Sequence, residues 1–180
     1  MWNLITLDGF FEGAKSWDLG FHQHAWCDEL QQFSMNQLRS ADMLLFGRVT
    51  YDGMAKYWKA AKGEDADYMN SLPKIVFSRS LERAEWENTK LVKGELAAEI
   101  QELKRQAKGN IFVFGSANLS TGIVEHGLFD EYRLAVVPVL LGRGKPLFGP
   151  NPDRLSLKLL EARPLSNGCV ILRYEPLKAP

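Results

Sequence analysis

The stretch Ile111-Phe-Val-Phe-Gly-Ser-Ala-Asn118 decides the fold of this chain. A short apolar run, typical of a buried strand, ends in small residues, and a helical pattern follows it. Such a turn brings the carboxyl end of a strand to the N-terminus of a helix, where free N–H groups and the helix dipole favour a phosphate. Gly115, Ser116 and Ala117 are small enough for a ligand to approach the backbone closely. An ordinary tight turn could have the same residues. The rest of the chain therefore has to distinguish a phosphate site from such a turn.

Strand-like and helix-like segments alternate around this stretch. Strands are expected at Trp2–Leu7, Met43–Phe46, Lys74–Phe77, 111–114, Glu131–Leu141, Leu155–Leu160 and Val170–Tyr174. Helices are expected at about residues 26–39, 51–60 and 95–107 and after residue 118, with residues 62–67 as a loop or a short helix start. Pro138 suits an edge strand or a bulge. The order predicts one α/β domain over residues 1–180, with a mostly parallel sheet that finishes in antiparallel strands.

The composition excludes several classes of function. The chain has 22 Lys and Arg against 22 Asp and Glu, so no net field draws it to nucleic acid or to an anionic membrane. No apolar run approaches the roughly 20 residues of a membrane span, and the N-terminus lacks a secretion signal. Cys27 and Cys169 are too few for a disulfide framework. We therefore expect a cytoplasmic protein.

Three expected strand ends carry groups that suit a nucleotide. Gly47, Arg48 and Thr50 combine a glycine, a guanidinium and a helix-capping hydroxyl. Ser78-Arg79-Ser80 offers a bidentate cation between two hydroxyls, and Gly115-Ser116-Ala117 is the turn described above. Arg48 could instead pair with a surface carboxylate, and residues 78–80 could be a solvated turn. Three such ends in one sheet favour a dinucleotide, and a separate Arg-Ser pocket favours NADP over NAD.

Other nucleotide and catalytic signatures are missing from the sequence. It has no GxGxxG motif that opens a βαβ unit, no GxxxxGK[ST] loop and no GxSxG elbow. His22 and His24 lie in a loop, His126 ends a distant helix, and there is no HExxH motif. We expect no metal site and no hydrolase.

Taken together, the chain resembles the dihydrofolate reductase superfamily. It is most similar to the reductase domain of bifunctional riboflavin-biosynthesis enzymes and its stand-alone relatives. The resemblance covers nearly the whole chain, and the order and spacing of its motifs carry it: Leu7-Asp8-Gly9, Phe46-Gly47-Arg48-Val49-Thr50-Tyr51, Ile75–Arg79, Phe112–Ser116, Asp130-Glu131-Tyr132 and Pro138–Phe148. The deaminase signature that accompanies this domain in the bifunctional enzymes is absent.

The resemblance implies a dihydrofolate reductase-like three-layer fold, NADPH as hydride donor and a homodimer. By position, Gly47, Arg48 and Thr50 would face the pyrophosphate or the 2′-phosphate, and Ser78 and Arg79 the adenosine side with its 2′-phosphate. The turn and first helical residues of the third strand end would line nicotinamide and pyrophosphate: Gly115, Ser116, Ala117, Asn118 and Leu119.

The resemblance also suggests catalytic and substrate residues. Asp8 lies on the loop after the first strand, near where nicotinamide would meet substrate, and Glu29 falls where folate reductases hold the pterin. Glu29 could equally be a solvated acid in the first turn of a helix. The proton for the product would come from Asp8, Glu29 or an ordered water. Arg143 and Lys145 could bind a substrate phosphate, or could be solvated turn residues.

The predicted function is that of an NADPH-dependent oxidoreductase. Its substrate would be a small heterocycle or a ribosylamino-pyrimidine, as in the 5-amino-6-(5-phosphoribosylamino)uracil reduction of riboflavin biosynthesis. Two alternatives stay open: a dihydrofolate or pterin reductase, which Glu29 favours, and an NADPH-binding module without catalysis.

Overall fold

The computed structural model describes residues 1–149 and 154–177. The chain divides into two compact units, which we describe separately. The terminal unit comprises residues 1–32 and 129–180, and the central unit comprises residues 33–128. Helix α1 (Asp28–Arg39) begins in the first and ends in the second. That residues 1–180 form a single domain stays a prediction.

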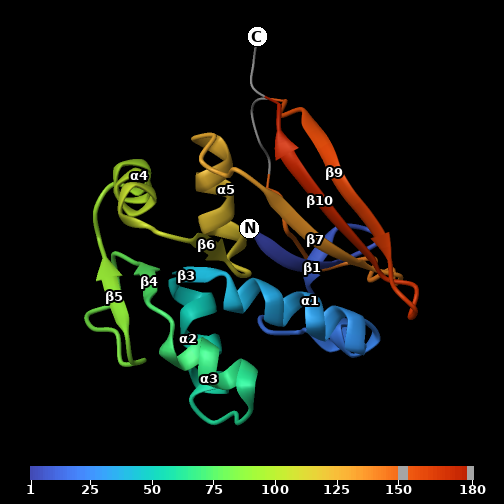
Figure 1. Cartoon of the computed structure of the whole chain (residues 1–180), viewed down its shortest axis with the longest axis horizontal. Coiled ribbons are helices and arrows are strands. Elements are labelled where there is room, and N and C mark those ends of the chain that lie inside the picture. The colour runs from blue at the N-terminus through green and yellow to red at the C-terminus, as the bar shows by residue number, and fades with distance from the viewer. Residues whose placement is uncertain (150–153, 178–180) are drawn as a thin grey trace. The chain divides into compact units, whose positions relative to one another are not determined.

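The central unit contains a parallel sheet in the order β5-β4-β3-β6 (Figure 1). Its strands are β3 (Ala41–Gly47), β4 (Lys74–Phe77), β5 (Thr89–Val92) and β6 (Asn110–Val113). Leu44, Leu45 and Phe46 of β3 are almost completely buried, as expected of a strand covered on both faces. The predicted strands at 43–46, 74–77 and 111–114 are therefore confirmed, each within a few residues.

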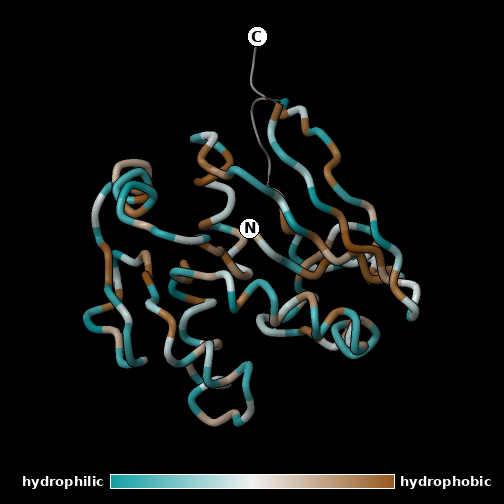
Figure 2. The backbone as a smooth tube through the Cα atoms, viewed as in Figure 1, coloured by the Kyte–Doolittle hydropathy of each residue, from teal (hydrophilic) through white to brown (hydrophobic). Residues whose placement is uncertain are grey.

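Four helices follow these strands: α2 (Arg48–Trp58), α3 (Glu64–Ser71), α4 (Leu96–Gln106) and α5 (Ala117–Glu125). In α4, Ile100 and Leu103 are buried, whereas the last turn carries basic side chains, and the alternation can be followed in Figure 2. The carboxylate of Glu95 accepts from the N–H of Ala97 at 3.0 Å and caps this helix. α2 begins at Arg48, three residues earlier than the sequence pattern indicates.

Helix α3 extends well beyond the predicted short start at residues 62–67. Three acids stand in its first turn, Glu64, Asp65 and Asp67, where the helix dipole favours negative charge. Ala66 and Met69 are buried on its other side. The acidic first turn is thus a helix start, which the sequence reading only partly recognised.

The terminal unit holds a mixed sheet in the order β1-β7-β10-β9. Its strands are β1 (Trp2–Thr6), β7 (Tyr132–Val137), β9 (Leu157–Pro164) and β10 (Val170–Pro176). β1 is parallel to β7, whereas β7, β10 and β9 are antiparallel in turn. Strands β2 (Phe10–Glu12) and β8 (Lys145–Pro146) form a separate ribbon, and η1 (Gly20–His24) is a 3-10 helix.

The expected strand at Glu131–Leu141 is shorter in the structure. β7 ends at Val137, since Pro138 has no N–H to continue the ladder. β7 also lies between β1 and β10, so the expected edge position or bulge for Pro138 was wrong. In the part of the chain that the structure describes, no helix combines the length and apolar character that crossing a membrane requires.

Candidate functional site

The carboxyl edge of the parallel sheet in the central unit gathers the three predicted turns. β3 lies between β4 and β6, and all three strands run in the same direction. Gly47 therefore ends the middle strand, with Ser78 after one neighbour and Gly115 after the other. From β3 the chain continues to β4 and β5 on one side, whereas β6 pairs with the other side of β3. The point beside β3 where the strand order reverses is a topological switch point, and open α/β sheets bind ligands there.

A hydrogen bond joins two of these turns. The backbone N–H of Gly47 donates to the hydroxyl of Ser116 at 3.0 Å. Ser116 is buried and adopts a left-handed conformation, with φ 61°, directly after Gly115 with the same φ. A non-glycine residue in this conformation is uncommon and is typical of strained functional turns. The bond holds the start of α2 beside the start of α5.

Neither of these two helix starts is capped by a side chain. Gly47 and Ser116 occupy the N-cap positions of α2 and α5, and neither makes a side-chain cap bond, in contrast to Glu95 of α4. A Cβ built on Gly47 would approach no neighbouring atom closer than 3.6 Å. Two adjacent helix N-termini thus present N–H groups and two positive dipole ends to an anion.

The two predicted arginines differ in their surroundings. Arg48 pairs with Asp52 one turn later in α2, at 3.3 Å, and both side chains are about half exposed. Such a pair contributes little and can exchange for a phosphate. Arg79 is exposed and has no ion-pair partner among the described residues. Asp52 is a residue that the sequence reading missed, although the i,i+4 spacing from Arg48 signals it.

The hydroxyl oxygen of Ser78 already accepts hydrogen bonds within its own turn. It accepts hydrogen bonds from the N–H groups of Ser80 at 3.3 Å and Leu81 at 3.0 Å. Ser78 therefore shapes the turn that carries Arg79, and its hydroxyl also lies 3.5 Å from the hydroxyl of Ser80.

The remaining predicted cofactor residues lie in the first turns of the two helices. Thr50 is half-buried in α2, and Asn118 is exposed in α5. Ala117 and Leu119 are buried in α5 and anchor its start in the core. All ten predicted cofactor-binding residues therefore belong to the central unit.

Asp8, a predicted catalytic residue, is held by three donors in the terminal unit. Its carboxylate accepts from the Thr6 hydroxyl at 2.6 Å, from the N–H of Gly142 at 2.8 Å and from the N–H of Leu141 at 3.3 Å. These bonds, that of Thr6 first, lower the pKa of Asp8. Asp8 therefore joins the loop after β1 to the segment after β7 as a carboxylate.

Glu29, the second predicted catalytic residue, has a similar arrangement. It accepts from the N–H of Ser166 at 2.8 Å and also from the Ser166 hydroxyl. The two bonds from Ser166 lower the pKa of Glu29, and the thiol of Cys27 lies 3.8 Å from the same oxygen. Glu29 thus ties the first turn of α1 to the β9–β10 turn.

The two predicted substrate residues are also in the terminal unit. Arg143 is exposed, and Lys145 begins β8 with its Nζ 5.9 Å from the ring centroid of Phe11. The candidate catalytic and substrate groups therefore stand in one unit and the candidate cofactor groups in the other.

The sequence and the fold were compared with those of known proteins. Residues 1–171 match the family model of the RibD C-terminal domain. The chain belongs to the RibD C-terminal domain family. This confirms the family expected from the motifs.

The relatives and solved structures agree with this membership. The uncharacterized protein YyaP of Bacillus subtilis is 34% identical over 178 residues, which cover 94% of this chain and 90% of YyaP. A putative riboflavin biosynthesis protein from Shewanella sp. PV-4 superposes with a TM-score of 0.83 at 22% identity, over 98% of this chain and 97% of that one. Dihydrofolate reductase from Enterococcus faecalis, complexed with NADP(H), gives a TM-score of 0.64 at 13% identity, over 98% and 95%. The predicted dihydrofolate reductase-like α/β fold is thereby confirmed.

Proposed function

We propose that this protein is an NADPH-dependent reductase that acts on a small heterocyclic or ribosylamino-pyrimidine substrate. The observation that carries the proposal is the hydrogen bond from Gly47 to Ser116, because it holds two uncapped helix starts side by side at a topological switch point. Membership of the RibD C-terminal domain family supports the same reaction class.

The groups in the central unit fit a dinucleotide with a 2′-phosphate. The first-turn N–H groups of α2 and α5 would hold the pyrophosphate, with Arg48 leaving Asp52 to join them. Arg79, free of any ion pair among the described residues, would bind the 2′-phosphate in a bidentate manner. When bound, NADPH supplies the hydride.

Asp8 and Glu29 would act as carboxylates that position their loops. Their lowered pKa values keep both groups ionised at neutral pH, so they are poor proton donors there. We therefore assign the product's proton to an ordered water, and to Asp8 and Glu29 the positioning of the loops that exclude bulk solvent. Arg143 and Lys145 would bind a substrate phosphate.

A pterin reductase would need Glu29 to accept hydrogen bonds from its substrate. That reaction asks the carboxylate to accept two N–H bonds from an amino-heterocycle. In this structure one oxygen of Glu29 receives both bonds from Ser166. The reading as a pterin reductase therefore gains no support from the geometry.

We further propose that the protein is a homodimer that pairs through strand β9. Among the described residues this strand pairs only with β10, and Leu157, Leu159 and Leu160 are 38%, 51% and 42% exposed. Exposed apolar edge strands are prone to pair with another chain. Light scattering should give twice the chain mass, and a Leu159→Lys variant should run as a monomer; a monomeric wild type would refute the pairing.

The experiment that tests the function is a titration with NADPH and NADH, followed by tryptophan quenching and energy transfer to the reduced nicotinamide. Strong NADPH binding and weak NADH binding are expected. Absence of binding to either would refute the cofactor assignment. Oxidation of NADPH with heterocyclic acceptors then distinguishes a reductase from a binding module without catalysis.

A further inference from the structure

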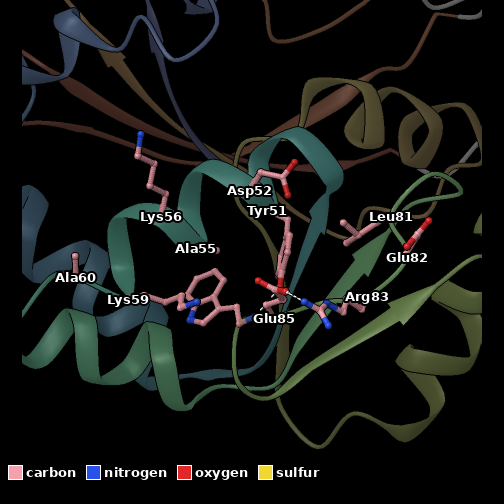
Figure 3. A pocket seen from close by; sticks show the side chains of 11 residues that line it. Tyr51, Asp52, Ala55, Lys56, Lys59, Ala60, Leu81, Glu82, Arg83 and Glu85 are labelled. Carbon is pink, nitrogen blue, oxygen red and sulfur yellow. Dashed lines mark hydrogen bonds and ion pairs between the residues drawn. The ribbon is translucent and has the colours of Figure 1, made fainter.

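The central unit contains a cavity that adjoins the turns after β3 and β4. It lies between α2 and the segment of residues 81–86 that leads from β4 towards β5, and it has a volume of about 630 Å³ (Figure 3). Tyr51, Ala55, Lys56 and Lys59 line it from α2, and Leu81 and Trp86 from the facing segment. We call it the α2 groove. It includes none of the residues assigned to the cofactor.

The floor of the α2 groove is aromatic and firmly held. The indole N–H of Trp86 donates to the amide oxygen of Asn70 at 2.7 Å, and its backbone N–H donates to the hydroxyl of Tyr51 at 2.8 Å. Phe46 stacks on Trp86 at 6.0 Å, and the ammonium of Lys74 lies 4.6 Å from the ring centroid. A floor fixed by four contacts is preorganised, so a ligand would lose little free energy in ordering it.

The rim of the α2 groove keeps free positive charge. Lys56 and Lys59 are exposed one helical turn apart, and neither has an ion-pair partner among the described residues. The acids beside them are largely neutralised, because Asp52 pairs with Arg48 and Glu85 pairs with Arg83 at 2.6 Å. Glu82 remains as a single opposing acid on the facing segment.

We propose that the α2 groove binds a small aromatic anion, an aryl carboxylate or aryl sulfonate in class. The flat ring packs against the edges of Tyr51 and Trp86 and against Ala55, where aromatic contacts are favourable. The acidic group lies at Lys56 and Lys59, and Glu82 disfavours ligands with a second negative charge at the other end. Concave sites with an apolar floor and few polar groups are typical of small-molecule binding.

The probe for this site is anilinonaphthalene sulfonate, an aromatic anion that fluoresces when bound. The titration is done without nucleotide, so that Arg48 stays paired with Asp52 as in the structure. We expect the Lys56→Gln/Lys59→Gln double variant to bind the probe about fivefold or more weakly, since two charges are removed. The Ala55→Trp variant fills the groove from a half-exposed helix position and should weaken binding about tenfold or more.

A matched control uses lysines outside the groove. Lys90 and Lys93 are exposed in the same unit, and the Lys90→Gln/Lys93→Gln variant should bind the probe like the wild type. Probe binding that is unchanged in both groove variants, or lost equally in the control, would overturn the proposal. NADP⁺ titrations of the same variants should be unchanged, so failure of the cofactor assignment and failure of the α2 groove give different results.

Discussion

The two edges of the parallel sheet in the central unit use their polar groups in opposite ways. At the carboxyl edge, α2 and α5 begin without side-chain caps and Arg79 has no ion pair among the described residues. At the amino edge, the buried Lys74 opens β4 and donates to the carbonyls of Met69 and Leu72 at 2.9 and 2.7 Å. Backbone groups satisfied within the chain stabilise the fold, whereas those left open are available to a ligand. The polar groups of the amino edge therefore stabilise the fold, and those of the carboxyl edge are available for function.

Replacing Lys74 should have the largest effect, and on stability alone. A Lys74→Met variant keeps the volume but leaves the carbonyls at the end of α3 without their donor. We expect the free energy of unfolding to fall by about 3 kcal/mol, measured by urea denaturation. A Lys90→Met variant on exposed β5 should change it by less than about 0.5 kcal/mol. Equal urea midpoints for wild type and Lys74→Met would contradict the stabilising role of the amino edge.

The same lysine should make stability depend on pH. Burial lowers the pKa of Lys74 from 10.5 to about 8, with Glu87 acting in the opposite direction. Between these values the unfolded chain holds more protons than the folded one, so the contribution of this group to stability rises with pH and is constant below about pH 8. We expect wild type to gain about 3 kcal/mol relative to Lys74→Met across this window. A difference that is flat with pH would show that Lys74 titrates normally.

At the carboxyl edge, Arg79→Ala should change cofactor choice without changing stability. Loss of a bidentate contact to the 2′-phosphate should weaken NADPH about tenfold and leave NADH unaffected. The measurement is the paired fluorescence titration, with Arg83→Ala as the control arginine because Arg83 pairs with Glu85. If both cofactors weaken alike, Arg79 does not recognise the 2′-phosphate.

Gly47→Ala tests the open helix starts directly. Gly47 has φ −79° and a Cβ there would lie 3.6 Å from the nearest atom, so folding should be unchanged. The added methyl group should hinder the phosphate and weaken NADPH about fivefold. Gly115→Ala is the contrasting variant, because φ 61° should cost about 1 kcal/mol of stability as well. Unchanged NADPH affinity in Gly47→Ala would place the pyrophosphate elsewhere.

The sequence predicted the strand-turn-helix units well because their signals are local. The apolar run before Gly115 and the small residues after it are contiguous, and so are those around Gly47. Partners far apart in the sequence could not be predicted in this way. Asp8 is bound by N–H groups 133 and 134 residues away, and Glu29 by Ser166, 137 residues away. The sequence could suggest acids at these places but not that the fold already engages them.

Short strands and polar helix starts were also difficult to predict from the sequence. Strands β2 and β8 contain three and two residues, too few to show a period of two. Helix α3 begins with three acids in Glu-Asp-Ala-Asp, and this composition predicts only a loop or a short helix start because the apolar stripe is only Ala66 and Met69. The hydroxyl of Ser78, predicted to hold the adenosine side together with Arg79, also accepts hydrogen bonds within the turn that carries Arg79.

The smallest expected effect concerns the ion pair between Arg48 and Asp52 at the carboxyl edge. Asp52 holds Arg48 in a half-exposed pair that a phosphate would have to break. An Asp52→Asn variant should therefore bind NADPH about twofold more tightly at low salt, and the gain should vanish at high salt, where exposed charges are screened. Asp67→Asn on α3 removes an exposed acid outside the turns and should have no effect. Weaker NADPH binding by Asp52→Asn would mean that Asp52 positions Arg48 for the phosphate, and the carboxyl edge would then be a preassembled site instead of an open one.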